Sequence, residues 1–219
     1  MTYGDGDGTT YNPLTAIDVL GHEITHGVTE HSAGLVYQDE PGALNESFSD
    51  IIGSCIEHYA KPAGFSWLLG NDMSVNGVAI RNMANPNSEG DPDTYQGTNW
   101  YFGTLDNGGV HTNSGVQNFW FYLLCEGGTG TNDNGDTYSV AGIGIENAGD
   151  IVFHSLTTYL NANSEYADAR AGSIQAATDL FGACSAELAA VTNAWYAVGV
   201  GDPKHVVQES GVGELARYE

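Results

Sequence analysis

The stretch that decides the fold is "AIDVLGHEITHGVTEH", residues 16–31. Apolar side chains recur in it at steps of three and four residues, at Ile17, Leu20, Ile24 and Val28. This spacing matches the period of an α-helix and predicts an amphipathic helix. Thr15 precedes the first apolar position and is the expected N-cap. The stretch therefore indicates a chain that is built, at least here, from helices.

The predicted helix carries the pattern H-E-x-x-H, formed by His22, Glu23 and His26. Each helical residue advances by about 100°, so the two histidines lie about 40° apart on one face. Both imidazoles can therefore reach one metal ion, and the Glu23 carboxylate can reach a water on that ion. This combination is typical of zinc peptidases. The pattern alone also arises by chance, so the interpretation depends on a third ligand.

The third ligand is the question that His31 raises. It follows the first histidine by nine residues, or about 900°, which turns it to the opposite face of a continuous helix. In the three-histidine pattern of the metzincins, Gly and His would stand where this chain has Thr29 and Ser32. We therefore interpret His31 as a helix-end or surface residue. The segment "NESFSD" supplies Glu46 as the expected ligand and Asp50, one turn further on, as a hydrogen-bond partner for a ligand imidazole.

Composition limits the classes of protein that the chain can belong to. It has 219 residues, enough for one domain with a core, and 28 acidic residues against 5 Lys plus Arg give a net charge of -23. This charge argues against nucleic acid and anionic membranes as partners, and no apolar run approaches the ~20 residues of a membrane span. A secreted protein, a salty habitat and cation binding all fit. Of three cysteines at least one is unpaired, and a disulfide between Cys125 and Cys184 is one option.

Patterning along the chain predicts a mainly α-helical protein with a short extended N-terminal segment. The further predicted helices cover residues 42–60, 114–125, 145–160, 165–182 and 185–198. The Asn-, Gly-, Asp- and Pro-rich residues 71–113 predict a long irregular stretch that is functional or stabilised by an ion, and residues 126–142 predict a loop. We expect one lobe over residues 1–203 and a tail over 204–219.

Several segments resemble the thermolysin family of zinc metalloendopeptidases. They are "GHEITHGV" at 21–28, "GLVYQDEPGALNESFSDI" at 34–51, "DNGGVHTNSG" at 106–115, "ATDLFG" at 177–182 and "AWYAVGV" at 194–200. The resemblance runs from residue 1 to about residue 200. It implies the helical, C-terminal catalytic lobe of that fold.

The resemblance implies a role for each matching side chain at the catalytic centre. His22, His26 and Glu46 would bind Zn²⁺. Glu23 would be the general base that activates the zinc-bound water. Tyr37 and His111 would hydrogen-bond the oxyanion, Asp106 would orient His111, and Asp50 would support a zinc ligand. These residue types suit the chemistry, because attack on a peptide carbonyl builds negative charge on its oxygen.

The same resemblance assigns substrate-binding residues. Arg81 would hold a substrate carbonyl, and the S1′ pocket would be lined by Tyr11, Leu14, Val19, Leu69 and Ile80. These pocket residues are apolar or aromatic, which implies cleavage on the amino side of a bulky hydrophobic residue. The alternative is that they are core residues.

The chain departs from the family pattern in two respects. The N-terminal β-rich lobe of the family is not in this sequence, so that lobe, or a propeptide, is an expected partner. Asp18 and Glu57 match calcium ligands, but the positions of further carboxylates hold Ser66, Leu68 and Asn71. Calcium prefers about six to eight oxygens, so this site is eroded. The segment "TNDNGD", with Asp133 and Asp136, offers another calcium loop, but a solvated turn is the preferred interpretation.

The sequence therefore predicts a zinc-dependent endopeptidase that hydrolyses peptide bonds through a zinc-activated water. We expect it to act outside the cell on peptides or proteins, with its export signal outside this sequence. The alternative is a zinc-binding fragment with little activity unless a complementary N-terminal lobe is present. A different zinc amidase is a third option, which the contexts of Tyr37 and His111 disfavour.

Overall fold

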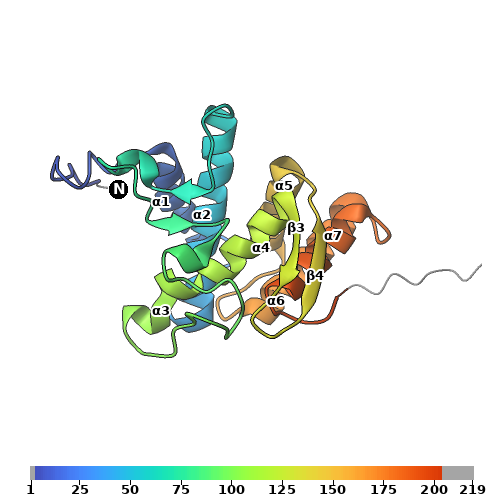
Figure 1. The fold of residues 1–219 in the computed structure, drawn as a ribbon. Helices are drawn as coiled ribbons and strands as arrows, with labels where there is room; N and C mark the ends of the chain where they lie inside the picture. The colour runs from blue at the N-terminus through green and yellow to red at the C-terminus, as the bar shows by residue number, and fades with distance from the viewer. Residues whose placement is uncertain (1–2, 204–219) are drawn as a thin grey trace, which may run out of the picture.

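A computed structural model describes residues 3–203, which form a mainly α-helical chain (Figure 1). The main helices are α1 Ile17–Glu30, α2 Asp39–Ala60, α3 Asp106–Asn113, α4 Gly115–Glu126, α5 Ile145–Thr158, α6 Tyr166–Phe181 and α7 Ala186–Ala197. The short elements are β1 Leu68–Leu69, η1 Asn71–Met73, β2 Arg81–Asn82, η2 Pro86–Ser88, β3 Gly127–Thr131 and β4 Thr137–Ala141. The predicted tail, 204–219, lies outside the described residues. No helix in the described part is long and apolar enough to cross a membrane.

Helices α1 and α2 pack so closely that their backbones touch. A Cβ atom on Gly53 would lie 2.4 Å from the backbone oxygen of Asp18, and one on Gly21 would lie 2.9 Å from the Cα of Gly53. Real Cβ contacts are not this short, so both positions need glycine. The close crossing brings the histidine-bearing face of α1 against the face of α2 that carries Glu46 and Asp50.

The core lies between α2, α4 and the C-terminal helices, which Figure 1 shows on the right-hand side of α4. Its largest buried side chains include Trp120 on α4 and Trp195 on α7, whose rings stack with their centroids 4.6 Å apart. Tyr166 at the start of α6 is also buried, and its hydroxyl donates a hydrogen bond to the backbone oxygen of Asn113. This core supports α4 and the loop that precedes it.

The predicted helices are confirmed, with differences at two starts. Helix α1 begins at Ile17 with Ala16 as N-cap, and no side chain caps it, so the prediction for Thr15 was wrong. The Thr15 hydroxyl instead makes a long contact of 3.5 Å with the backbone oxygen of Pro13. Helix α2 begins at Asp39 rather than at residue 42. Pro41 does not prevent this, because the first-turn N–H groups of a helix lack intrahelical partners anyway.

The loop predicted over residues 126–142 is instead an antiparallel hairpin, with β3 paired to β4 from Gly127 opposite Ala141 to Thr131 opposite Thr137. Three glycines in β3 lower its strand propensity, which explains the wrong prediction. Packing overrides that propensity, because Val140 of β4 is buried in the core. Asn132 closes the turn by accepting the backbone N–H groups of Asn134 and Asp136.

The irregular stretch 71–113 contains short elements and is tied together by side-chain bonds to the backbone. The Asn113 side chain accepts the N–H of Tyr101 at 2.9 Å and donates to its backbone oxygen at 3.1 Å. The Asp133 carboxylate accepts the N–H of Thr98 at 2.6 Å. The "TNDNGD" segment is therefore a turn that supports this stretch.

All three cysteines are free in the structure. Cys125 is buried on α4 whereas Cys184 is exposed, so the disulfide considered between them does not form. Cys55 is partly buried, and burial raises the pKa of its thiol to about 12.

Candidate metal centre

The two histidines of α1 point their Nε2 atoms at each other across 3.0 Å. Each ring is held through its other nitrogen, His22 Nδ1 by Asp50 Oδ1 at 2.8 Å and His26 Nδ1 by Asn45 Oδ1 at 2.8 Å. Because these partners accept hydrogen bonds, the ring protons of the neutral imidazoles lie on Nδ1. Two Nε2 lone pairs then face one point, which is an arrangement that requires a cation between or beside them.

Glu46 supplies the third ligand atom. Its carboxylate oxygens lie 3.4 Å from His26 Nε2 and 3.5 Å from His22 Nε2. The residue is 1% exposed, and Oε2 makes no hydrogen bond among the described residues. His22, His26 and Glu46 bring one ligand atom each within 4.8 Å of one another. Two imidazole nitrogens and one carboxylate oxygen fit Zn²⁺ and leave a fourth position open, as in catalytic zinc sites.

Asp50 supports the ligand set through its hydrogen bond with His22 Nδ1. It is fully buried and accepts two hydrogen bonds from Arg81, at 2.7 and 2.6 Å, and one from the Asn118 side chain at 2.8 Å. Burial would raise the pKa of Asp50, but the charges of Arg81 and His22 hold it well below its usual range. Burial would likewise lower the pKa of His22, yet its bond to Asp50 raises it. The surroundings therefore favour positive charge at His22, as a metal or a proton.

Tyr37 and His111 lie on the open side of the cluster. The Tyr37 hydroxyl donates to Glu46 Oε1 and lies 3.2 Å from His111 Nε2. Burial and the Glu46 carboxylate raise the pKa of Tyr37, which keeps its hydroxyl protonated. His111 Nδ1 contacts Asp106 Oδ1 at 2.7 Å. Tyr37 can thus present a hydrogen-bond donor to an oxygen placed beside the ligands, and His111 can do so when both of its ring nitrogens carry protons.

The backbone before His111 adopts a left-handed turn. Asp106, Asn107, Gly108 and Gly109 have positive φ values of 52°, 50°, 89° and 78°. Aspartate, asparagine and glycine are the residues that tolerate this region best. The turn is closed where Asp106 Oδ2 accepts the N–H of His111 at 3.0 Å. The "DNGGVH" sequence therefore sets both the position and the tautomer of the imidazole.

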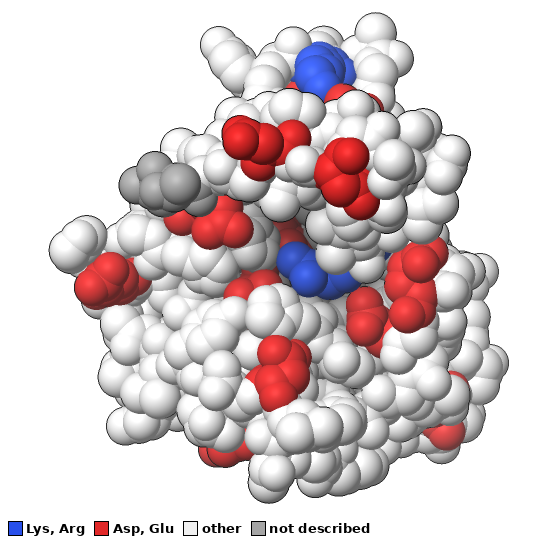
Figure 2. Space-filling view, turned by 90° about the vertical axis from the view of Figure 1, so that its left-hand side faces the viewer, with Lys and Arg blue, Asp and Glu red and all other residues white. Residues whose placement is uncertain are grey.

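A cavity of about 170 Å³ opens beside the ligands and is lined by Glu23 and Arg81 together with His22, Glu46 and His111. Of the predicted pocket residues, Val19, Leu69 and Ile80 also line it. Tyr11 and Leu14 are not in this lining: Tyr11 pairs with Ser74, and the Leu14 backbone bonds to Gly4. Figure 2, viewed from the side of α1, shows a hollow with basic atoms inside it and acidic groups around it.

Comparison with known proteins agrees with this geometry. The family described as thermolysin metallopeptidase, α-helical domain, matches residues 33–200, and the catalytic domain of the same peptidases matches residues 1–30. The chain belongs to the thermolysin metallopeptidase family. It is 48% identical over 204 residues to bacillolysin from Bacillus cereus and 47% identical to thermolysin from Alicyclobacillus acidocaldarius subsp. acidocaldarius. These alignments cover 91% of the chain but 35% and 36% of the relatives, so the chain spans about a third of their length.

A solved structure shows the same fold. The precursor of protealysin, a metalloproteinase from Serratia proteamaculans, aligns with a TM-score of 0.76 at 31% identity. The alignment covers 91% of this chain and 62% of that one.

The structure places the predicted zinc ligands of this thermolysin-family chain together with Glu23, Tyr37, His111, Asp106, Asp50 and Arg81. His31 is the exposed C-cap of α1 and lies outside the ligand cluster. Sequence reasoning missed Asn45 and Asn118, the side chains that hold His26 and Asp50. Asn45 immediately precedes Glu46, so its helical position could have revealed it, whereas Asn118 lies on a different helix and carried no local signal.

Proposed function

We propose that this chain forms the catalytic lobe of a zinc-dependent endopeptidase. The observation that carries the proposal is the pair of Nε2 lone pairs 3.0 Å apart beside a buried, unbonded carboxylate oxygen of Glu46. His22, His26 and Glu46 would hold the zinc. When bound there, zinc would supply a Lewis acid for a peptide carbonyl and would acidify water.

The protein's own side chains would perform the remaining steps. Glu23, at the edge of the cavity, would take a proton from the attacking water and deliver it to the leaving amine. The Tyr37 hydroxyl and His111, as an imidazolium with protons on both Nδ1 and Nε2, would donate hydrogen bonds to the oxygen of the attacked carbonyl. Asp106 would keep the His111 ring in place.

Substrate selection would depend on the apolar wall of the cavity. Val19, Leu69 and Ile80 line it next to the ligands, which supports a preference for a bulky hydrophobic residue at P1′. Tyr11 and Leu14 would contribute only to a larger pocket that extends beyond this cavity. Arg81 is 13% exposed and already binds Asp50, so its contact with a substrate carbonyl would be an additional one.

Partners and setting follow from the same proposal. Peptides or proteins would be the substrates, and the similarity to a protealysin precursor supports a propeptide or N-terminal lobe as a further partner. The strongly acidic composition is compatible with action outside the cell. Nucleic acid is not an expected partner because of this charge.

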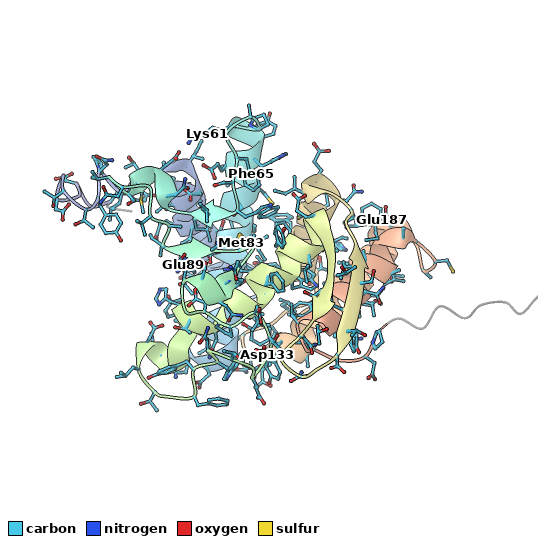
Figure 3. All side chains as sticks on the ribbon, in the orientation of Figure 1. Lys61, Phe65, Met83, Glu89, Asp133 and Glu187 are labelled. Carbon is cyan, nitrogen blue, oxygen red and sulfur yellow. The ribbon has the colours of Figure 1, made fainter. Side chains whose placement is uncertain are left out.

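The test combines zinc stoichiometry with cleavage of quenched peptides that differ only at P1′, carrying Leu, Phe or Asp. Glu23→Gln should retain one zinc per chain and lose about 10²–10⁴-fold of the cleavage rate. Glu187→Gln is the matched control, because Figure 3 shows Glu187 on α7, on the far side of the molecule from α1. Undiminished cleavage by Glu23→Gln would refute the base assignment. Full zinc binding without turnover by the unmodified chain would favour the zinc-binding fragment.

A further inference from the structure

Two further acidic side chains are buried on α1 and α2: Asp18, which lines the same cavity as His22 and Glu46, and Glu57, in the last turn of α2. Asp18 of α1 is 1% exposed and Glu57 of α2 is 4% exposed. Burial, together with the nearby Asp18 carboxylate, raises the pKa of Glu57. Two buried carboxylates that repel each other need a positive charge to stabilise their ionised forms.

The donor set there does not fit the calcium ion that the family resemblance implies. The Asp18 carboxylate accepts the backbone N–H of Gly70 at 2.6 Å and that of Val19 at 2.9 Å. Position 68 holds leucine, whose side chain has no oxygen to offer. Among the described residues, only the zinc ligands bring three His, Cys or carboxylate groups within 4.8 Å. Calcium would require about six to eight converging oxygens.

Lys61 supplies a positive charge beside Glu57. The Lys61 ammonium group donates to Asp72 Oδ2 at 2.6 Å and lies 3.6 Å from Glu57 Oε1. Lys61 follows directly after α2, and Figure 3 shows it at that end of the helix. The only other lysine in the sequence is Lys204, outside the described residues. The placement of so rare a residue beside a buried carboxylate is a second observation that points the same way.

The contacts of Asp18 and Lys61 extend to the segment that lines the cavity beside the proposed zinc ligands. Asp72 belongs to η1, which follows directly after Leu69 and Gly70, two residues of the cavity lining. Asp18 ties α1 to the same segment through Gly70. The segment is therefore joined to α1 by the hydrogen bond from Gly70 N–H to the Asp18 carboxylate. It is joined to the end of α2 by the ion pair between Asp72 and Lys61.

We propose that the Lys61 ammonium group supplies the positive charge beside Glu57 and Asp72. We further propose that the fold requires no calcium ion at Asp18 and Glu57. A protonated amine takes the place of a bound divalent ion. The segment around Leu69 is then held in place by the protein's own side chains, so its position does not depend on the calcium concentration. This proposal concerns stability and is independent of the peptidase activity.

The experiment measures thermal unfolding of the zinc-loaded protein in buffer freed of calcium by a chelating resin, with zinc restored. Calcium is then added at about 5 mM, above the dissociation constants of weak extracellular sites. Sodium chloride at equal ionic strength is the control. We expect the unfolding temperature of the unmodified chain to be the same in calcium and in the salt control. A saturable rise of several degrees, with one calcium bound per chain, would overturn the proposal.

Two variants of Lys61 separate charge from packing. Lys61→Met keeps the length of the side chain and removes the ammonium, so it should unfold about 2–4 °C lower, the shift for loss of a modest ion pair in a chain of this size. Lys61→Arg should unfold at the temperature of the unmodified chain. Equal unfolding temperatures for Lys61→Met and Lys61→Arg would contradict the proposal. Asp72→Asn removes the other partner and should reproduce the loss, with no further loss in the double variant.

Discussion

The contact between α1 and α2 gives a sharp prediction for Gly53→Ala. The added Cβ would lie 2.4 Å from the backbone oxygen of Asp18, and backbone cannot swing away as a flexible side chain can. Relieving the clash requires α1 to move, at a cost of about 1–3 kcal/mol for overpacking. Alanine regains about 1 kcal/mol of helix propensity, which partly offsets this cost. We expect a net loss of up to about 2 kcal/mol, or up to about 8 °C in unfolding temperature.

The same displacement would reach the metal centre. His22 and His26 lie on α1 whereas Glu46 lies on α2, so moving the helices apart stretches the ligand set. Gly53→Ala should therefore also lose zinc faster to a chromophoric chelator. Gly27→Ala is the matched control, because it lies on α1 with nothing within 4 Å of its Cβ position, and it should be neutral or stabilising. If the two variants unfolded alike and released zinc at the same rate, the reasoning about the helix contact would be wrong.

Three further outcomes are expected. Asp50→Asn should lower zinc affinity by about 10–100-fold in chelator competition, because a charged partner of a ligand imidazole is lost; unchanged affinity would contradict its supporting role. His31→Ala should leave zinc stoichiometry at one, since the residue is the exposed C-cap of α1, and loss of the metal would reverse that interpretation. In native protein at pH 8 a disulfide-exchange reagent should react quickly with Cys184 alone, because burial raises the thiol pKa values of Cys55 and Cys125; three fast thiols would refute this.

Helical periodicity was enough to predict most of the helices, and helix geometry was enough to propose a ligand set that the structure brings together. His22, His26 and Glu46 could be assigned because a ligand pair four residues apart on one helix is a local signal, and the third ligand followed within a short distance in sequence. The same geometry turned His31 away, and the structure places it at the helix end. The family resemblance extended this to His111, whose loop has no periodicity from which a position could be derived.

What the sequence did not predict depended on contacts between distant segments. The β3–β4 hairpin has a glycine-rich first strand, and only burial of Val140 against the helices makes the pairing favourable. Asn118 supports Asp50 from a helix 68 residues away in sequence. The prediction of Thr15 as N-cap was wrong because it, too, relied on local sequence alone. A local propensity is a weak preference, and α1 is held by its backbone contact with α2 rather than by a capped end.

The few cations of this chain show how a net charge of -23 is compatible with a buried polar interior. Of its five Lys and Arg residues, the structure describes Lys61, Arg81 and Arg170. Arg81 lies against the buried Asp50, and Lys61 against Glu57 and Asp72, whereas Arg170 bonds to the backbone oxygen of Asp202. Surface carboxylates are stabilised by water, so they need no such partner. Buried ones need a cation or backbone N–H groups, as the bonds of Asp18 to Val19 and Gly70 illustrate. Glu46 Oε2 has no hydrogen bond, and its nearest cation is Arg81, whose Nη2 lies 3.7 Å away. A guanidinium lies against Asp50 and an ammonium against Glu57, and Arg81 is shared with Asp50, so a zinc ion held by His22, His26 and Glu46, as proposed, would supply the further positive charge that Glu46 lacks.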